Sequence, residues 1–406
     1  MLRARDHPDR DFDLLWAGQG VSQVGDAVTR LALPLTAVLL LQASTLQVGG
    51  LESAAAASWL LLSLAAGAWA DRLPRRLVLL GCDVTRAVLL VSVPVAWALG
   101  WLHLAQLYVV AFLSGAATVL FAAGYTAYLP SLVPAERIAR ANARLQSTGE
   151  AANIAGTGVG GALVSLVTGP GALLVDAVSF ALAAVATARI RHREPPAPPT
   201  ERHLRREIAE GLRTTFGQPT LRALALFSGL ANVSFSALTT VTLVLLARDL
   251  HLSGAVIGAL YMVSGLGGLL GGLMATRVLD RIGLSRATWL PGLFTLPFAL
   301  LQPMVGHGAH LVPYAIGTLL VDAGVVTYNV AVATYLQTRV PRTMVGRTSS
   351  AIRMVSRGAI VLGGLAGGVL SAWLGLRGAM WLLAAVIALL PVAQALSPLR
   401  RFGDVA

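Results

Sequence analysis

Four acidic residues lie inside long apolar stretches of the sequence, where charged side chains are rare. They are Asp26, Glu52, Asp176 and Asp322. An ionised carboxylate is costly in the apolar interior of a membrane, so each of the four is expected to serve a function. A carboxyl group in such a place can accept a proton from one side and release it to the other. Asp26 and Asp322 fall nearest the middle of their stretches, so depth favours these two as proton carriers.

Asp26 also has an alternative role as half of an ion pair. Arg30 follows it by four residues and lies on the same face of a helix. A carboxylate held in a static pair stays ionised and carries protons poorly, which would leave Asp322 or Glu52 as the better candidates. Pairing and proton transfer can also alternate as the protein changes state.

A second set of charges is predicted near the cytoplasmic ends of the apolar stretches. Asp83 and Arg86 are three residues apart and share a helix face. Together with Glu150, Arg353 and Arg357 they can build a charged inner gate. The arginines have an alternative role, because long basic side chains also extend from helix ends to lipid headgroups.

Polar and aromatic side chains near the middle of the apolar stretches are the candidates for substrate contact. Residues of these types also serve to pack or hydrogen-bond helices together, which is the alternative role for each of them. Their surroundings are largely apolar with few fixed charges, which suits an amphipathic or lipophilic compound better than a sugar phosphate. The candidates are Gln23, Arg30, Tyr125, Asn232, Tyr261, Tyr328 and Asn329.

The composition indicates that these residues lie in a helical membrane protein. Hydrophobic residues make up 56% of the 406 residues and charged residues 12%, against about 45–50% and about 25% in soluble domains. The net charge of +12 comes from arginines in short clusters, so a nucleic-acid-binding surface is not expected. An all-α fold is expected, because a helix pairs its own backbone groups inside a bilayer.

Apolar runs of about 20 residues, the length that crosses the hydrocarbon layer, predict twelve transmembrane helices. The first six cover 14–41, 46–70, 77–99, 105–128, 146–167 and 171–190. The second six cover 221–246, 254–275, 287–305, 311–336, 348–374 and 378–395. Arginine clusters precede the first span and fill every second connection, so both termini are expected to be cytoplasmic. The sequence contains arginine but no lysine, which is typical of GC-rich bacteria and suggests a bacterial cytoplasmic membrane.

A polar segment, 191–220, divides the chain into two predicted six-helix halves, 1–190 and 221–406. The segment opens with a proline-rich stretch typical of an extended spacer. Apolar residues then recur at every fourth position from Leu204 to Phe216 among charged ones. This pattern predicts an amphipathic helix that lies on the cytoplasmic face of the membrane.

An internal repeat relates the two halves. Three glycines of the fifth span recur in the eleventh span at one constant offset, which is the signature of a duplication. Small residues at these intervals let helices approach closely, so both sets are expected at helix interfaces. The sets are Gly156, Gly160 and Gly161, and Gly363, Gly367 and Gly368.

The connection after the second span reads GAWADRLPRR from Gly67 to Arg76. It resembles the cytoplasmic signature of the major facilitator superfamily, with Pro74 where that signature usually has glycine. The resemblance implies a twelve-helix fold of two pseudo-symmetric halves that transports by alternating access. Ion pairs in this loop can close the cytoplasmic mouth and break when it opens, although a positive-inside anchor is the alternative role. The predicted gate residues of the loop are Gly67, Asp71, Arg72, Arg75 and Arg76.

Three further segments, which begin at Phe12, Leu132 and Glu207, resemble the bacterial exporters of this superfamily that include siderophore and macrolide efflux proteins. The glycine-rich run 156–161 is similar to the antiporter motif of the superfamily, with Thr157 in place of its usual proline. These resemblances imply proton-coupled efflux of amphipathic or lipophilic small molecules such as drugs, macrolides or siderophores. An importer or facilitator of a small metabolite is the alternative, followed by a non-transporting membrane sensor.

An enzyme, a metal site and a cofactor are not expected. The sequence offers no convergent nucleophile, acid pair or nucleotide-binding motif. Cys82 is the only cysteine, and the seven histidines include no pair suited to a metal. The predicted function is therefore secondary transport by a monomer, with a small-molecule substrate, protons and the lipid bilayer as its partners.

We expect the double substitution Asp71→Asn with Arg76→Gln to change the transport rate, because it removes charges that close the predicted cytoplasmic gate. Initial rates of transport should be compared between wild type and variant at equal membrane abundance. Equal rates would contradict a gating role for this loop.

Overall fold

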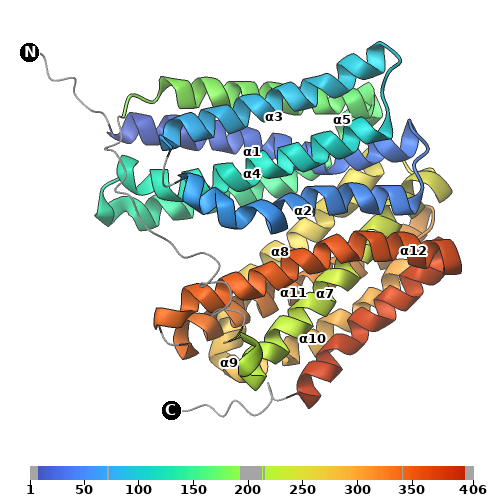
Figure 1. The fold of residues 1–406 in the computed structure, drawn as a ribbon. Helices are drawn as coiled ribbons and strands as arrows, with labels where there is room; N and C mark the ends of the chain where they lie inside the picture. Colours follow the sequence, from blue (N-terminus) through green and yellow to red (C-terminus); the bar gives the residue numbers. More distant parts are fainter. Residues whose placement is uncertain (1–7, 71–72, 193–212, 214, 341, 398–406) are drawn as a thin grey trace, which may run out of the picture. The chain divides into compact units, whose positions relative to one another are not determined.

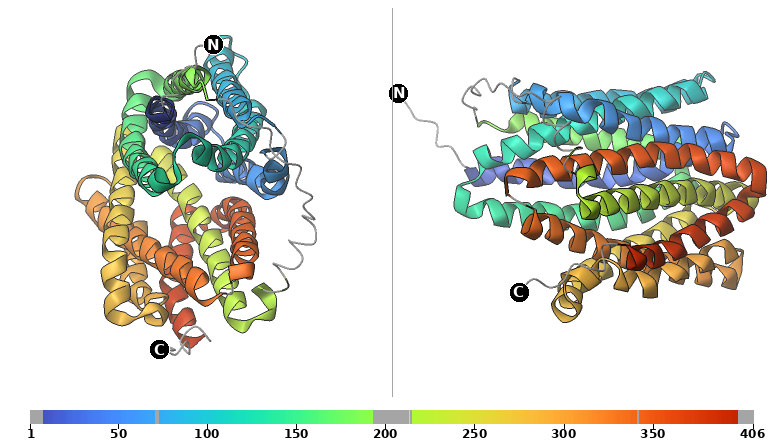
Figure 2. Two further views of the ribbon diagram at one scale, coloured as in Figure 1. Left: turned by 90° about the vertical axis from the view of Figure 1, so that its left-hand side faces the viewer. Right: turned by 60° about the horizontal axis from the view of Figure 1, so that its bottom comes forward.

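The computed structural model describes residues 8–70, 73–192, 213, 215–340 and 342–397. The first part of the chain forms α1 (Pro8–Leu39), α2 (Thr45–Ala70), α3 (Arg75–Ala98) and α4 (Leu104–Leu132). A 3₁₀ turn, Ala135–Arg137, then leads into the long helix α5 (Ile138–Arg189). These helices are coloured blue to green in Figure 1. In the left view of Figure 2 they are seen nearly end-on, and α5 packs against both α1 and α3.

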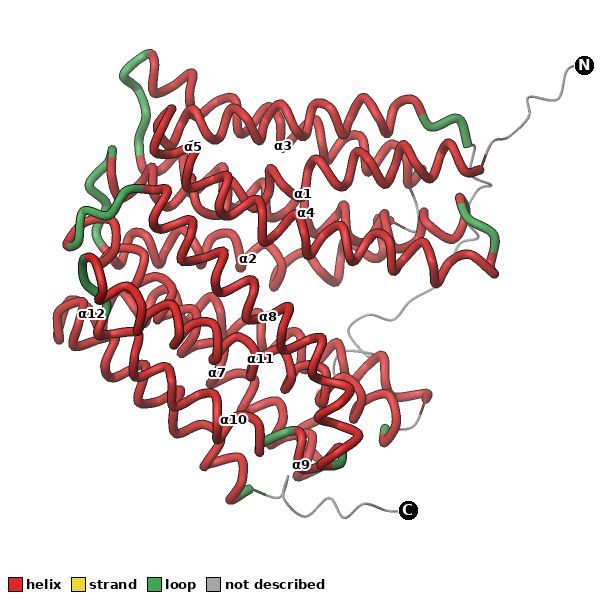
Figure 3. The backbone as a smooth tube through the Cα atoms, turned by 180° about the vertical axis from the view of Figure 1, so that it is seen from behind, coloured by secondary structure: helices red, strands yellow, loops and turns green. Residues whose placement is uncertain are grey.

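The second part of the chain is also helical. It begins with α7 (Pro219–Val244), which continues through a π-helical turn, Leu245–Asp249, and is followed by α8 (Gly254–Ile282). The short helices α9 (Leu284–Ala287) and α10 (Leu290–Thr295) precede 3₁₀ segments at Leu296–Met304 and Gly308–His310. The chain ends with α11 (Leu311–Arg339) and α12 (Arg342–Leu396). Figure 3 shows helices joined by short loops, and the described residues contain no strand, so the predicted all-α fold is confirmed.

Two of the long helices are interrupted where the sequence predicts a connection between spans. Inside α5, Thr168 has non-helical dihedral angles, and inside α12 the same is true of Gly375. Pro170 follows the first break and lacks the N–H that a continuous helix needs. The offset that relates the two sets of glycines also relates Thr168 to Gly375, so the internal repeat extends to these breaks.

The predicted ninth span, 287–305, is not a continuous α-helix. The region is divided into α9, α10 and the 3₁₀ segment Leu296–Met304. Pro291, Pro297 and Pro303 recur along it, and each proline removes a backbone donor from an α-helical ladder. The apolar composition that predicts a span is therefore present, but the regular hydrogen bonding of an α-helix is not.

Seven helices among the described residues are long and apolar enough to cross a membrane by length and composition. Two of them contain the interrupted helices α5 and α12, each of which covers two predicted spans. The predicted amphipathic helix lies outside the described residues except for 213, 215 and 216. The full count of twelve spans stays a prediction.

The repeated glycines make equivalent contacts in the two parts of the chain. A Cβ atom added to Gly156 would lie 2.8 Å from the carbonyl oxygen of Val24 on α1, and one added to Gly363 would lie 2.6 Å from that of Val233 on α7. Gly160 and Gly367 meet the same two helices one turn further on. Gly161 contacts Gly258 near the start of α8, whereas Gly368 contacts Leu46 near the start of α2. The prediction of close helix packing at these glycines agrees with these contacts.

The contacts within the chain divide it into two compact units. The first contains Met1–Gln42, Ala54–Arg202 and Ser253–Ala259, and the second contains Ala43–Ser53, His203–Leu252 and Leu260–Ala406. Each unit thus includes the first residues of one helix, α8 or α2, that continues in the other unit. The buried core of the first unit includes Leu15, Leu79, Tyr128 and Leu145, and that of the second includes Leu221, Leu224 and Leu336. The predicted half boundaries at 190 and 221 stay a prediction.

The two repeat-equivalent breaks differ in backbone strain. Thr168 has φ 67° and ψ 171°, a conformation that is essentially restricted to glycine, and its side chain is exposed. Gly375 has φ 71° and ψ 167°, and a Cβ atom added to it would meet no atom within 4 Å. A side chain at either position is therefore strained by its backbone and not by its neighbours.

We expect Thr168→Gly to stabilise the protein by about 1 to 3 kcal/mol and Gly375→Thr to destabilise it by a similar amount. Thermal unfolding of the detergent-solubilised variants, followed by intrinsic fluorescence, measures both changes. The two substitutions act as controls for each other, and shifts of the same sign would contradict this account of the breaks.

Candidate functional site

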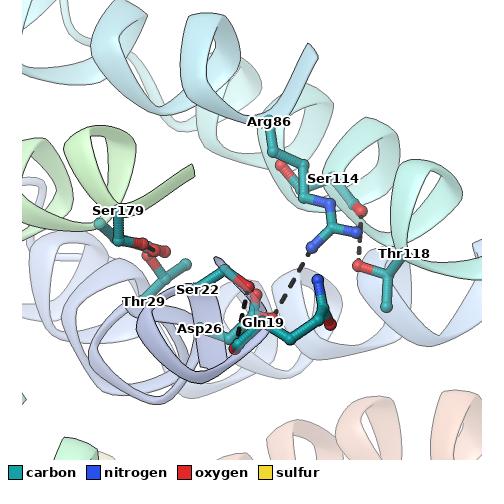
Figure 4. A network of polar contacts seen from close by, with 9 residues as sticks. Gln19, Ser22, Asp26, Thr29, Arg86, Ser114, Thr118 and Ser179 are labelled. Atoms are coloured by element: carbon teal, nitrogen blue, oxygen red, sulfur yellow. Dashed lines mark hydrogen bonds and ion pairs between the residues drawn. The ribbon is translucent and has the colours of Figure 1, made fainter. Parts of the chain in front are cut away.

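An ion pair between a buried arginine and a partly exposed aspartate joins α1 to α3 in the first unit. Arg86 of α3 is 4% exposed, and its Nη1 atom lies 3.7 Å from Oδ2 of Asp26 on α1 (Figure 4). Arg86 lies about 16 Å along α3 from Arg75, at 1.5 Å per residue. The pair is therefore deep in the bundle. Arg30, the predicted alternative partner of Asp26, instead donates a hydrogen bond to Oδ1 of Asn153 on α5.

Two aromatic rings hold the guanidinium group of Arg86. Its Cζ atom lies 5.0 Å from the ring centroid of Phe121 on α4 and 4.6 Å from that of Phe180 on α5. The faces of aromatic rings attract cations, and this attraction is stronger where water is excluded. Arg86 thus connects α3 with α1, α4 and α5 through one charge.

Asp83 is a second acid beside Arg86, one turn earlier on α3. It is 1% exposed, and neither of its carboxylate oxygens has a hydrogen-bond partner among the described residues. Nε and Nη2 of Arg86 likewise have no hydrogen-bond partner there. Buried polar groups without partners are costly. Binding of a proton or a new hydrogen-bond partner by Asp83 would therefore lower the free-energy cost of burying its carboxylate.

Asp176 of α5 is a third acid in the first unit and is fully buried. It accepts hydrogen bonds from the hydroxyl of Thr29 on α1 and, at 2.8 Å, from Ser179. Asp26, Asp83 and Asp176 thus share the first unit with the guanidinium groups of Arg86 and Arg30. Carboxyl groups outnumber guanidinium groups in this cluster, so neutrality requires at least one proton or another cation.

A cavity of about 740 Å³ opens beside this cluster, between α1, α4 and α5. The side chain of Asp26 is 41% exposed and faces the cavity. The cavity brings together three predicted substrate contacts, one predicted proton carrier and one predicted gate residue. The gate residue, Glu150, accepts a hydrogen bond from Gln146 at 2.8 Å. These five residues are Gln23, Arg30, Tyr125, Asp26 and Glu150.

The second unit contains the other two predicted proton carriers, Glu52 and Asp322, and both are hydrogen-bonded to hydroxyl groups. Oε2 of Glu52, near the start of α2, accepts from Thr240 at 3.0 Å and from Ser236 at 3.4 Å, both on α7. Asp322 of α11 accepts from Ser264 on α8 and, at 3.3 Å, from Thr318. A hydroxyl can donate to a carboxylate and accept from a protonated carboxyl, so these partners can serve both forms of the acid.

A second cavity, of about 390 Å³, lies between α7, α10, α11 and α12 in the second unit. Three predicted substrate contacts line it, together with one predicted gate residue: Asn232, Tyr328, Asn329 and Arg353. The hydroxyl of Tyr328 lies 3.3 Å from that of Ser228, whose carbonyl oxygen accepts from Asn232 at 2.7 Å. Tyr261 is not among the lining residues and lies instead near Tyr314 and Glu52.

The predicted cytoplasmic gate is only partly described. Asp71 and Arg72 lie outside the described residues, and Gly67 lies in the last turns of α2. Arg76 donates to the carbonyl oxygens of Thr187, at 3.2 Å, and of Ala188, in the last turn of α5. A cation at this position satisfies carbonyl groups that end the helix and opposes its dipole. Arg75 is half-buried, and Arg357 is exposed on α12.

Sequence reasoning missed the partners of the acids. Hydroxyl residues are common in membrane helices, so nothing in their type marks Ser264, Thr240 or Ser236 as acid partners. Thr29 gave no signal either, because the acid to which it donates, Asp176, lies on a different predicted span. Phe121 and Phe180 could not be assigned to Arg86, since each comes from a different helix and the sequence does not fix helix neighbours.

Long apolar helices that enclose charged side chains and cavities define a multi-pass membrane protein of the solute-transporting class. The sequence profile of the Major Facilitator Superfamily matches this chain over residues 15–364 and 225–404. The chain belongs to that superfamily and is a transporter of small-molecule substrates. The predicted membership of this superfamily is thereby confirmed.

Relatives and solved structures agree with this assignment. The MFS-type transporter y4rN of Sinorhizobium fredii is 28% identical over 385 residues, which cover 93% of this chain and 94% of that protein. The multidrug efflux pump Tap of Mycolicibacterium fortuitum is 27% identical over 395 residues, 94% of each chain. The nucleoside transporter NupG, 13% identical, aligns over 97% of this chain and 100% of its own with a TM-score of 0.80. A bacterial homologue of the human lysosomal transporter Spinster, 16% identical, aligns over 99% and 100% with a TM-score of 0.76. At these identities the structures establish a shared fold.

Removing either partner of the Asp26–Arg86 pair should destabilise the protein. We expect Arg86→Gln to cost about 3 to 5 kcal/mol, because it leaves carboxyl groups without their buried counter-charge. The double variant with Asp26→Asn should be more stable than the sum of the single effects, by about 1 to 3 kcal/mol. Unfolding in detergent measures the cycle, with Arg281→Gln at an exposed position on α8 as the control, and additive effects would show that the two groups do not interact.

Proposed function

We propose that this transporter exports amphipathic or lipophilic small molecules in exchange for protons, by alternating access. The main support is the acid cluster of the first unit, Asp26, Asp83 and Asp176, in which Asp26 pairs with Arg86 and faces a cavity. Such a cluster can hold a proton when the cavity is empty and release it when a substrate arrives. Proton binding and substrate binding would then be coupled through one carboxyl group.

Competition at Asp26 is the simplest form of this coupling. A cationic substrate in the cavity stabilises the ionised carboxylate, whereas a proton neutralises it, so each ligand weakens the binding of the other. Arg86 would keep the carboxylate oriented, and Asp83 beside it offers a second place for the proton. The exchange of one proton for one monovalent cation moves no net charge, so the pH difference drives it. A proton that moves down a difference of one pH unit releases about 1.4 kcal/mol, which is enough to concentrate a substrate roughly tenfold.

The lining of the two cavities supports an amphipathic substrate. The first cavity presents charged and amide side chains beside the ring of Tyr125. The second combines Phe235, Val325 and Leu296 with the polar groups of Asn232 and Tyr328. Few charges occur in the second cavity, so an uncharged apolar portion of a substrate is suited to it. The relative named multidrug efflux pump supports the same substrate class.

Glu52 and Asp322 are further proton-carrier candidates in this proposal, because hydroxyl partners can stabilise both of their forms. We also propose that the protein lies in a bacterial cytoplasmic membrane with both termini in the cytoplasm. Arg137, Arg140, Arg277 and Arg281 lie at helix ends of the side that the arginine pattern predicts to be cytoplasmic. Each chain carries its own acids and cavities, so we propose that it functions as a monomer.

Uptake of a lipophilic cationic dye into inverted vesicles, driven by an imposed pH gradient, tests the proposal. We expect Asp26→Asn to lower the gradient-driven rate at least tenfold, because the shared site for proton and dye is lost. Asp280→Asn, which removes an exposed carboxylate on α8, should leave the rate unchanged. An uptake rate of Asp26→Asn equal to that of wild type would overturn the assignment of the proton site. An uptake rate that does not depend on the pH gradient would overturn proton coupling.

Dye binding to the purified protein separates coupling from folding. In wild type the affinity should fall as the pH is lowered, because protonation removes the negative charge that attracts the dye. In Asp26→Asn the affinity should be lower and independent of pH over the same range. A pH dependence that persists unchanged in this variant would move the proton site to another acid.

A further inference from the structure

A basic cleft of about 460 Å³ lies at one end of the first unit, away from the acid cluster. It is formed where the start of α1, the end of α4 and the start of α5 meet. Arg137, Arg140 and Arg144 line it on the side of α5, and apolar residues, Phe12, Leu132 and Val133, form much of the rest. The transport mechanism proposed above uses none of these residues.

One arginine of the cleft is held in a fixed position. The guanidinium of Arg144 donates to Oδ1 of Asp13 at 2.7 Å, and its Cζ atom lies 3.7 Å from the ring centroid of Trp16 and 5.7 Å from that of Phe12. Trp16 is itself anchored by a hydrogen bond of 3.0 Å from its indole nitrogen to Thr148. An arginine that serves only as a membrane anchor needs no such support. The positive-inside rule therefore explains why the cleft is positively charged, but it does not explain the contacts that hold Arg144 in place.

The charge of the cleft favours an anion. Three arginines stand against one acid among the lining residues, Asp13. The start of α5 lies at the same place, and the N-terminal end of a helix carries a partial positive charge. Guanidinium groups bind the oxygens of phosphate groups in pairs of parallel hydrogen bonds, which lysine cannot do.

The position of the cleft selects a lipid over a free anion. Leu132 is the last residue of α4, and α5 begins soon after it, and both are apolar enough to cross a membrane. The cleft therefore lies at the level of the lipid headgroups. Phe12, Leu132 and Val133 offer an apolar surface that a glycerol backbone can contact and a free phosphate ion cannot use.

We propose that this cleft binds the phosphodiester headgroup of an anionic phospholipid. Basic pockets between transmembrane helices on the cytoplasmic side are suited to such headgroups. The bound lipid would connect the ends of α1, α4 and α5, the helices that enclose the larger cavity. Anionic lipid would therefore stabilise the first unit.

The test measures lipid binding to the detergent-purified full chain by native mass spectrometry. The probes are phosphatidylglycerol, phosphatidylcholine and inorganic phosphate. The double variant Arg137→Gln with Arg140→Gln should bind phosphatidylglycerol about 30-fold more weakly than wild type, at about tenfold for each 1.4 kcal/mol and about 1 kcal/mol per arginine. The control, Arg277→Gln with Arg281→Gln, removes the same charge from exposed positions on α8 and should bind as wild type does.

A second variant changes the binding in the opposite direction. Asp13→Asn releases Arg144 from its ion pair and adds to the net positive charge, so it should bind phosphatidylglycerol about fivefold more tightly. The pair is 44% and 55% exposed, so its loss should have little effect on folding. Equal loss of binding in the control variant, equal binding of phosphatidylcholine, or displacement of the lipid by millimolar inorganic phosphate would each overturn the proposal.

Discussion

The cost of burying a charge among apolar helices governs the first unit of this transporter. A guanidinium group is charged in proteins, so the charge of Arg86 must be balanced by its surroundings. The carboxylate of Asp26 and the rings of Phe121 and Phe180 provide that balance, and they come from three different helices. The packing of α1, α3, α4 and α5 is therefore tied to the position of one guanidinium group.

The same cost of burying charge affects the protonation of the acids in the first unit. Asp83 is buried next to Arg86 without a hydrogen-bond partner, and Asp176 relies on two hydroxyl groups. The cluster holds more carboxyl groups than guanidinium groups, so its protonation state and its contacts cannot change independently. The acids of the second unit lie in a different environment, where hydroxyl partners replace arginine. Protonation in the first unit therefore removes a negative charge beside an arginine, whereas in the second unit it removes one that is hydrogen-bonded to hydroxyl groups.

Sequence reasoning was most reliable where a property depends on one helix alone. The apolar runs located the helices, and the repeat offset located the glycines that permit close contact. The apolar runs end just before Thr168 and Gly375, where the two long helices break, and the repeat offset relates these two breaks. The ninth span is helical over 290–304 but changes from α to 3₁₀ at Leu296, which hydropathy does not predict because it takes no account of the backbone donors that three prolines lack.

Properties that depend on helix neighbours were beyond the sequence. Asp26 has Arg30 one turn away, and only the arrangement of α1, α3 and α5 shows that Arg86 faces Asp26 while Arg30 faces Asn153. The candidate substrate contacts were chosen by residue type, yet several of them line two defined cavities. Tyr261 was chosen in the same way and lies elsewhere, which shows how little residue type says about direction within a bundle.

The order of the Asp26 partners along the chain has a consequence for biosynthesis. Helix α1 leaves the ribosome before α3, with an acid near its middle, and Arg86 follows only when α3 has been made. An aspartate at the centre of a lone helix costs about 2.5 to 3.5 kcal/mol on insertion. The first helix is thus poorly suited to enter lipid by itself. The translocon would have to retain α1 until α3 arrives, so that the two helices leave it as a neutralised pair.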